Sequence, residues 1–128
     1  MIACETVWKS RRPAAVVVAG DVDGALAAAL AARKMGITLI HLEAGLRSGE
    51  RDLPEEINRR AIDAISDILW APDEASAARL RQEGHSAAAV RAVGNAMVDT
   101  QIRHLQAARA KRLPRGLSRG GYGLVTLH

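Results

Sequence analysis

The chain has no phenylalanine and only three other aromatic residues, Trp8, Trp70 and Tyr122, so it offers almost no stacking platform for unpaired nucleotide bases. Its single cysteine, Cys4, excludes an internal disulfide framework and a cysteine-rich metal site. Its four histidines form neither a His-x-x-x-His pair nor a His-Glu-x-x-His helix, so a protein-bound zinc is not expected. We therefore predict no metal and no nucleic-acid partner.

Long apolar runs are also missing. Asp21, Asp23, Arg33 and Lys34 interrupt the longest Ala/Leu/Val stretch well before the roughly 18 apolar residues that a membrane span needs. The amino-terminal residues show no basic region leading into an apolar segment, so no secretory signal is predicted. We expect a cytoplasmic location and no membrane partner.

Acidic residues are absent from the last part of the chain. Residues 101–128 carry six Lys/Arg and no Asp/Glu, whereas residues 1–100 carry 12 Lys/Arg and 14 Asp/Glu. The net charge of +4 therefore comes entirely from the carboxyl-terminal segment. A basic tail can bind nucleic acid, but with so few aromatic residues we favour a solvated helix face followed by a linker.

The 128 residues, 48% of them hydrophobic, alternate short apolar runs with helical patterns. Such alternation is typical of βαβ units and a parallel sheet. The predicted strands are residues 14–19, 37–42, 67–71, 90–93 and 122–127. The predicted helices are residues 24–35, 54–66, a segment that opens at Pro72-Asp73 and stops at Gly84, and residues 96–112. The fold class is therefore α/β, with a Rossmann-like parallel sheet and flanking helices.

Carboxylates follow the first two predicted strands. Asp21 comes after a valine-rich strand and Gly20, and Glu43 comes directly after residues 37–42. The carboxyl ends of parallel strands face the crevice where open α/β sheets bind ligands, so Glu43 and Arg47 are expected to point into a cleft. Two alternatives stay open: Asp21 caps the next helix, or Glu43 and Arg47 form a structural ion pair.

More ionisable residues follow at the start of the helix 54–66. Glu55 and Glu56 occupy its first turn, where the helix dipole favours negative charge in any protein. We interpret Asn58, Arg59 and Asp63 as an exposed polar face of this helix. Several carboxylates and a histidine in one cleft would suit a sugar reaction that removes a proton and returns it. No Gly-x-Gly-x-x-Gly motif supports a nicotinamide cofactor, and we expect none.

Four segments closely resemble the non-hydrolysing UDP-N-acetylglucosamine 2-epimerases. They are Val-Val-Val-Ala-Gly-Asp at 16–21, His-Leu-Glu-Ala-Gly-Leu-Arg-Ser-Gly at 41–49, Leu-Pro-Glu-Glu-Ile-Asn-Arg at 53–59 and Val-Gly-Asn-Ala-Met-Val-Asp at 93–99. The resemblance implies part of a two-domain, glycosyltransferase-B-like fold. It also implies reversible conversion of UDP-N-acetylglucosamine to UDP-N-acetylmannosamine, by elimination of UDP and its re-addition, in a protein that is a homodimer at full length.

The resemblance also assigns roles, residue by residue. The catalytic residues that it implies are Asp21, Glu43, Glu55 and His128, and the substrate-binding residues are Gly20, Arg47 and Asn95. Which carboxylate removes the proton from carbon 2 stays open. The chain departs from the family pattern at Asp23-Gly24-Ala25 and at Ala96, where relatives commonly carry hydroxyl side chains.

The family is built of two Rossmann-like halves, and the chain resembles a middle fragment of it. Residues 1–93 match the later part of the first half, and residues 94–128 match the opening helix, linker and first strand of the second. Because the uridine-binding wall would be missing, we predict negligible epimerase activity for this polypeptide alone. The competing interpretations are a glycosyltransferase of the same architecture and an inactive truncated product.

Overall fold

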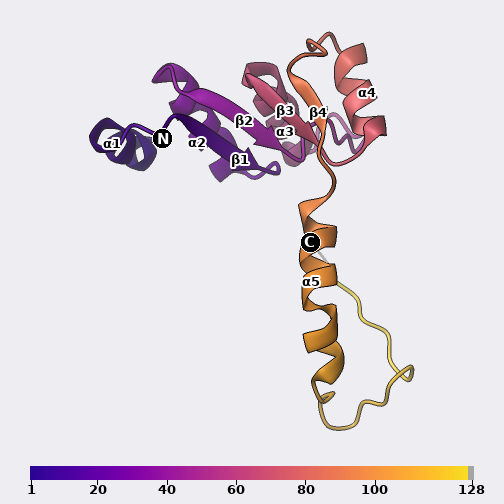
Figure 1. Cartoon of the computed structure of the whole chain (residues 1–128). Helices are drawn as coiled ribbons and strands as arrows, with labels where there is room; N and C mark the ends of the chain where they lie inside the picture. The colour runs from indigo at the N-terminus through magenta and orange to yellow at the C-terminus, as the bar shows by residue number, and fades with distance from the viewer. Residues whose placement is uncertain (127–128) are drawn as a thin grey trace. The chain divides into compact units, whose positions relative to one another are not determined.

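A computed structural model describes residues 1–126, which form two compact units divided between Asn95 and Ala96 (Figure 1). The first unit contains four strands and four helices, and the second contains one helix and a loop. In chain order the elements are α1 (Ile2–Ser10), β1 (Ala15–Ala19), α2 (Asp23–Lys34), β2 (Thr38–Leu42), α3 (Pro54–Ile65), β3 (Ile68–Ala71), α4 (Glu74–Gln82), β4 (Val90–Ala92) and α5 (Ala96–Ala110).

The four strands of the first unit form one parallel sheet in the order β1-β2-β3-β4 (Figure 1). This confirms the predicted α/β fold class. Since each strand lies beside the strand before it and right-handed crossovers are the rule, the connecting helices are expected on one face of the sheet.

The buried core confirms that arrangement. The strand register aligns Val16 with Leu39, and His41 with Leu69, which in turn aligns with Val90, so all these side chains share one face. Against them pack Ala29 and Ala32 of α2 and Ile62 of α3 at one end of the sheet, and Ala77 and Leu80 of α4 at the other. This face positions α3, which carries most of the candidate site.

The boundaries of α2 and α4 follow from local chemistry. Gly36, at a φ of 65°, ends the turn after α2, a conformation that glycine adopts without strain. Asp73 caps α4, because its carboxylate accepts a hydrogen bond of 2.7 Å from the backbone amide of Ser76. That bond holds the pKa of Asp73 below its usual value. The predicted start of this helix at Pro72-Asp73 and its predicted stop at Gly84 are confirmed.

Two sequence predictions were incomplete or wrong. Helix α1 was not predicted; it buries none of its residues fully, and only Trp8 packs on the core. The strand predicted at residues 122–127 is absent from residues 122–126, which have no regular structure, and the remainder lies outside the described residues. A strand needs a hydrogen-bonded neighbour, which an apolar sequence pattern cannot supply.

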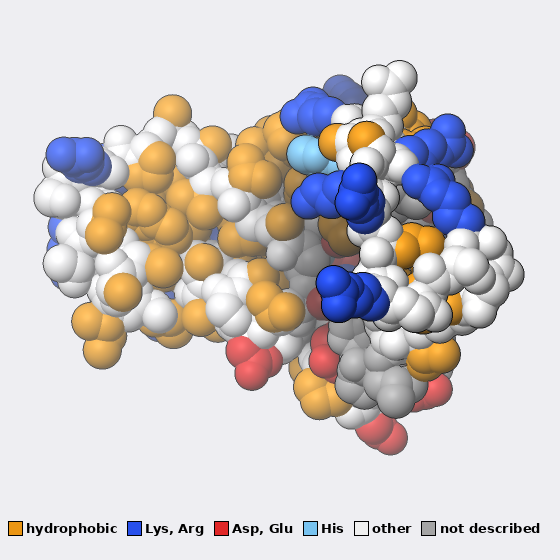
Figure 2. Space-filling model, turned by 90° about the horizontal axis from the view of Figure 1, so that it is seen from below, with side chains coloured by type: hydrophobic (Ala, Val, Ile, Leu, Met, Phe, Trp, Pro, Cys, Tyr) orange, Lys and Arg blue, Asp and Glu red, His pale blue; other side chains and the backbone are white. Residues whose placement is uncertain are grey.

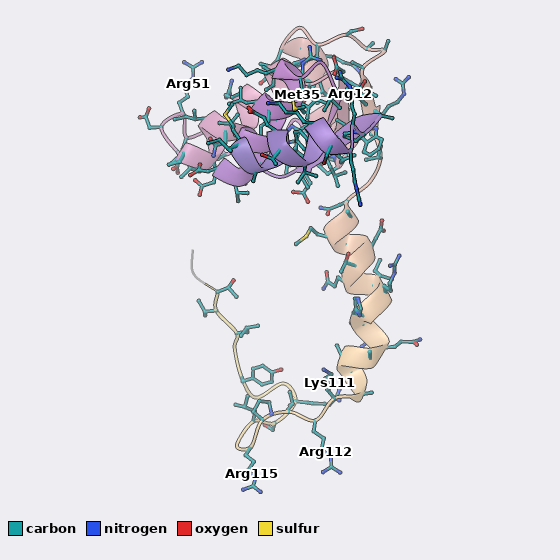
Figure 3. All side chains as sticks on the ribbon, turned by 90° about the vertical axis from the view of Figure 1, so that its left-hand side faces the viewer. Arg12, Met35, Arg51, Lys111, Arg112 and Arg115 are labelled. Atoms are coloured by element: carbon teal, nitrogen blue, oxygen red, sulfur yellow. The ribbon has the colours of Figure 1, made fainter. Side chains whose placement is uncertain are left out.

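The segment after α1 is tied to the end of α2 by a guanidinium. Arg12 donates a hydrogen bond of 2.8 Å to the carbonyl oxygen of Met35 and one of 3.3 Å to that of Gly36 (Figure 3). Figure 2 shows hydrophobic side chains gathered over the side of this unit that carries α1, α2 and β1. The large exposed hydrophobic residues of these elements include Ile2, Val7, Val17 and Leu30, together with Val22 at the start of α2.

The second unit consists of α5 and the loop that follows it. Arg119 donates a hydrogen bond of 2.6 Å to the carbonyl oxygen of Arg109, which joins the loop to the end of the helix. The side chains of Arg112 and Arg115 extend away from the chain, in line with a solvated basic segment (Figure 3). In the part of the chain that the structure describes, no helix is long and apolar enough to cross a membrane.

Candidate active site

The carboxyl ends of β1 and β2 bring two predicted catalytic residues next to each other. Asp21 follows β1, and Glu43 follows β2. A carboxylate oxygen of Glu43 lies 3.7 Å from the position that a Cβ atom on Gly20 would occupy. Gly20 has a φ of 68°, which an L side chain rarely adopts, so the backbone conformation at this position favours glycine.

Glu55 reaches the same turn from α3. It lines a cavity of about 230 Å³ together with Val22, Asp23, Pro54 and Asn58. Asn58 connects α3 to the turn beside that cavity: it donates hydrogen bonds of 2.9 Å to the carbonyl oxygen of Asp21 and 2.8 Å to the carboxylate of Asp23. Glu43 and Glu55 therefore lie beside the turn at residues 20–23, which contains Asp21.

Glu43 combines an unusual backbone with an unpaired carboxylate. Its φ is 71°, and no other non-glycine residue among those described has a positive φ. This conformation costs about 1–2 kcal/mol, and such strain collects at functional sites. Among the described residues, the carboxylates of Glu43 and Glu55 make no hydrogen bond or ion pair, so both are available to a ligand.

Glu56, by contrast, is fully engaged inside the protein. Its side chain is 1% exposed and accepts hydrogen bonds from the Ser48 backbone amide at 3.0 Å, from Arg59 at 2.7 Å and from Arg60 at 2.8 Å. Burial raises the pKa of this carboxyl, but the hydrogen bonds from Ser48 and Arg60 outweigh it and lower the pKa to about 2. The structure thus separates two adjacent glutamates that the sequence could not distinguish.

Asp63 joins β2 to the loop at residues 43–53. One carboxylate oxygen lies 2.6 Å from Nδ1 of His41, and the other lies 2.8 Å from Arg47 and accepts from the Gly45 amide at 3.3 Å. Arg47 also pairs with Glu83. Burial lowers the pKa of the Arg47 guanidinium. The contacts with Glu83 and Asp63 raise this pKa by more than burial lowers it, so the net shift is upward.

This arrangement corrects two interpretations of the sequence. The polar face of α3 is not exposed: Asn58 is 7% and Asp63 is 1% exposed. Asn58 donates hydrogen bonds to the turn at residues 21–23, and the loop at residues 43–53 supplies partners to Asp63. Arg47 pairs with Asp63 and Glu83 and not with Glu43, and its side chain is only 7% exposed instead of pointing freely into a cleft. Its predicted role in substrate binding stays a prediction.

Asp21 is held by α3 and does not cap α2. Its carboxylate pairs with Arg59, whose guanidinium also contacts Glu56. The N-cap of α2 is Val22, without a side-chain hydrogen bond, so the alternative role of Asp21 as a helix cap is wrong. Arg59, which sequence reasoning assigned to the surface, links the candidate catalytic aspartate to the buried Glu56.

Two predicted site residues remain. Asn95 is the last residue of the first unit, and His128 lies outside the described residues. Within residues 1–126, no group of three or more His, Cys, Asp or Glu side chains could hold a metal ion. Sequence reasoning gave no role to His41; a histidine inside an apolar strand was the available signal.

Known proteins match this chain over its full length. The profile of the UDP-N-acetylglucosamine 2-epimerase family matches residues 1–128. The UDP-N-acetylglucosamine 2-epimerase of Methanocaldococcus jannaschii is 40% identical over 133 residues, which cover 100% of this chain but 36% of that protein. The UDP-2,3-diacetamido-2,3-dideoxy-D-glucuronate 2-epimerase of Pseudomonas aeruginosa is also 40% identical, over 131 residues, and again 36% of its length is covered.

Solved structures agree with the sequence matches. The M. jannaschii UDP-N-acetylglucosamine 2-epimerase in complex with UDP-GlcNAc and UDP superposes with a TM-score of 0.83 at 43% identity, over 86% of this chain and 30% of that one. The enzyme from Neisseria meningitidis bound to UDP-GlcNAc gives a TM-score of 0.81 at 32% identity, over 85% of this chain and 30% of that one. The chain thus spans about a third of the length of these relatives, and it belongs to the UDP-N-acetylglucosamine 2-epimerase family.

Proposed function

We propose that this chain supplies the acidic wall of the catalytic cleft of a UDP-N-acetylglucosamine 2-epimerase. In the proposed reaction a proton leaves carbon 2 of the hexosamine and the bond from carbon 1 to UDP breaks, giving a glycal. UDP then re-forms that bond while a proton returns to the other face of carbon 2, giving UDP-N-acetylmannosamine. The observation that carries the proposal is the gathering of Asp21, Glu43 and Glu55 around one turn, with the last two unpaired.

The chemistry of these carboxylates suits the two proton transfers. Epimerisation needs one group that accepts the proton and another that donates it on the opposite face of the sugar. Glu43 and Glu55 come from different elements and have no protein partner among the described residues, so each can act on a ligand. The carboxylate of Asp21 forms an ion pair with Arg59.

The remaining assignments belong to the same proposal. Residues 1–93 would form the later part of the first Rossmann-like half, and residues 94–128 would open the second, with Gly20, Arg47, Asn95 and His128 serving the substrate or the leaving diphosphate. The non-hydrolysing course of the reaction, the UDP-sugar partner and the homodimer stay predictions, supported by the resemblance. The cytoplasmic location stays a prediction from the sequence pattern.

Isotope exchange tests the proposal. A chimera in which residues 1–128 replace the matching segment of the M. jannaschii relative is incubated with UDP-N-acetylglucosamine in D₂O. We expect deuterium at carbon 2 in both epimers, and a loss of at least about 100-fold in exchange rate for Glu43→Gln, because general acid–base groups contribute on that scale. Glu50→Gln, an exposed change in the same loop, is the matched control and should leave exchange unchanged.

Transfer of the sugar to an acceptor without deuterium at carbon 2 would contradict the proposal and favour a glycosyltransferase. A Glu43→Gln chimera that exchanges as fast as the Glu50→Gln chimera would remove Glu43 from the mechanism. The 128-residue chain by itself should show no exchange, because the missing part of the fold supplies the remote binding energy that stabilises the transition state. Turnover by the chain alone at the rate of the chimera would overturn that expectation.

A further inference from the structure

The imidazole of His41 is fully buried, and both of its nitrogens face hydrogen-bond acceptors. Nε2 lies 3.0 Å from the carbonyl oxygen of Gly20, and Nδ1 lies 2.6 Å from the carboxylate of Asp63. A carbonyl oxygen can only accept, so Nε2 must carry a proton. The proton between Nδ1 and Asp63 can belong either to the ring or to the carboxyl group. Its position decides the charge of the ring beside the candidate site.

The other partners of Asp63 decide where this proton lies. Its second carboxylate oxygen lies 2.8 Å from a guanidinium nitrogen of Arg47 and accepts from the backbone amide of Gly45 at 3.3 Å. Two donors on this oxygen, one of them charged, favour the ionised carboxylate. An ionised Asp63 can only accept at its first oxygen, so Nδ1 must donate as well and the ring carries both protons.

Charge balance in the surrounding network points the same way. Eight side chains are connected through ion pairs: the cations Arg47, Arg59 and Arg60, the anions Asp21, Glu56, Asp63 and Glu83, and His41. With a doubly protonated His41, four positive charges face four negative ones. A neutral ring would leave one excess negative charge in the network, whose centre is buried: His41, Glu56 and Asp63 are at most 1% exposed, while Asp21 and Glu83 are 26% and 29% exposed. Such an excess beside buried carboxylates is unfavourable.

Two residues of this network contact Asp21 or the peptide group before it. Arg59 holds its carboxylate, and His41 holds the carbonyl of Gly20, which belongs to the peptide group that leads into Asp21. We propose that His41 is a positioning residue that works as a doubly protonated imidazolium and, with Asp63, fixes the turn that presents Asp21. The importance of this turn for catalysis rests on the proposed function, whereas the protonation of the ring and its grip on Gly20 do not.

The protonation is measured directly on the 128-residue chain with ¹⁵N-labelled histidine. We expect the NMR spectrum at neutral pH to show protons on both ring nitrogens of His41, exchanging slowly with water because the ring is buried. His85 and His104, whose rings make no hydrogen bond among the described residues, serve as internal references in the same spectrum. A His41 ring with one bare nitrogen would overturn the proposal.

Two aspartate variants sharpen that measurement. Asp63→Asn should convert His41 to a neutral ring with its proton on Nε2, because the new amide can donate to Nδ1 while Gly20 still needs a donor. Asp67→Asn is the control, since Asp67 pairs with the exposed Arg33 and lies outside this network, so His41 should keep both protons. Retention of both protons in Asp63→Asn would contradict the proposal. If that variant does not fold, the wild-type spectrum decides alone.

A histidine variant tests the grip on the turn. His41→Asn should shift the carbonyl ¹³C resonance of Gly20 and the amide resonance of Asp21, while His85→Asn should leave both in place. Unchanged Gly20 and Asp21 resonances in a folded His41→Asn chain would show that His41 only fills space. These spectra need no substrate, so failure of the chimera to exchange deuterium would refute the proposed reaction without touching this result.

Discussion

Replacing Gly45 with alanine is expected to destabilise the first unit by about 3 kcal/mol or more. Gly45 has a φ of 80°, which costs an L residue about 1–2 kcal/mol. An added Cβ atom would also lie 2.6 Å from the carbonyl oxygen of Ser76 and 2.8 Å from Cγ of Leu80. The first of these is a backbone atom of α4 that no side-chain rotation can move away, so overpacking adds about 1–3 kcal/mol. Denaturant unfolding followed by circular dichroism measures the loss.

Gly49 provides a matched control for this prediction. Its φ of 86° is close to that of Gly45, but an added Cβ atom would meet nothing within 4 Å. Gly49→Ala should therefore cost only the backbone strain, about 1–2 kcal/mol. The difference between the two variants measures how tightly the loop at residues 43–53 is pressed against α4. Equal losses in both variants would mean that α4 moves aside freely.

Glu56→Gln should produce the second large effect, a loss of about 3 kcal/mol in the free energy of unfolding at neutral pH. The pKa of Glu56 is lowered from 4.5 to about 2, and this shift corresponds to about 3 kcal/mol of stabilisation by the ionised carboxylate. The change to glutamine removes the negative charge that Arg59 and Arg60 share, and leaves them facing a neutral amide. Breaking buried ion pairs costs amounts of this size.

The pH dependence identifies the cause of that loss. Because the pKa is lower in the folded chain, the stabilisation is complete above about pH 4.5 and disappears as the pH falls toward 2. The difference in the free energy of unfolding between wild type and Glu56→Gln should therefore disappear as the pH falls over that range. Glu50→Gln, an exposed change in the neighbouring loop, should stay within about 0.5 kcal/mol of wild type throughout. A difference that stays constant down to pH 2 would mean that packing, not charge, stabilises this position.

The strands and most helices of the first unit could be predicted because local patterns agree with the tertiary structure. The valines of β1 favour a strand, and Pro54 and Asp73 mark the starts of α3 and α4. Helix α1 escaped prediction because no position in it is fully buried and its cap uses no side-chain hydrogen bond. Its only contact with the core, through Trp8, depends on α2 being in place.

The sequence predicted where the candidate site residues lie on the sheet, but not the hydrogen bonds and ion pairs that they form. Strand ends gave the positions of Asp21 and Glu43, since the carboxyl ends of parallel strands share an edge. The sequence could not show which of Glu55 and Glu56 is buried. Both lie in the first turn of α3, and as consecutive residues they point in different directions from the helix axis. The sequence pattern assigned Arg59 and Asp63 to the surface, but Arg59 pairs with Asp21 and Glu56, and Asp63 binds His41 and the loop at residues 43–53.

The position of β1 at the rim of the sheet affects how the polypeptide behaves at high concentration. Among the described strands β1 pairs only with β2, so its other edge presents free amide and carbonyl groups, and Val17 on its outer face is 51% exposed. An uncovered rim with an apolar side chain is a template for strand addition between molecules, the first step of amyloid-like aggregation. The chain in isolation is therefore best kept dilute, and a lysine in place of Val17 would act as a gatekeeper against fibre growth.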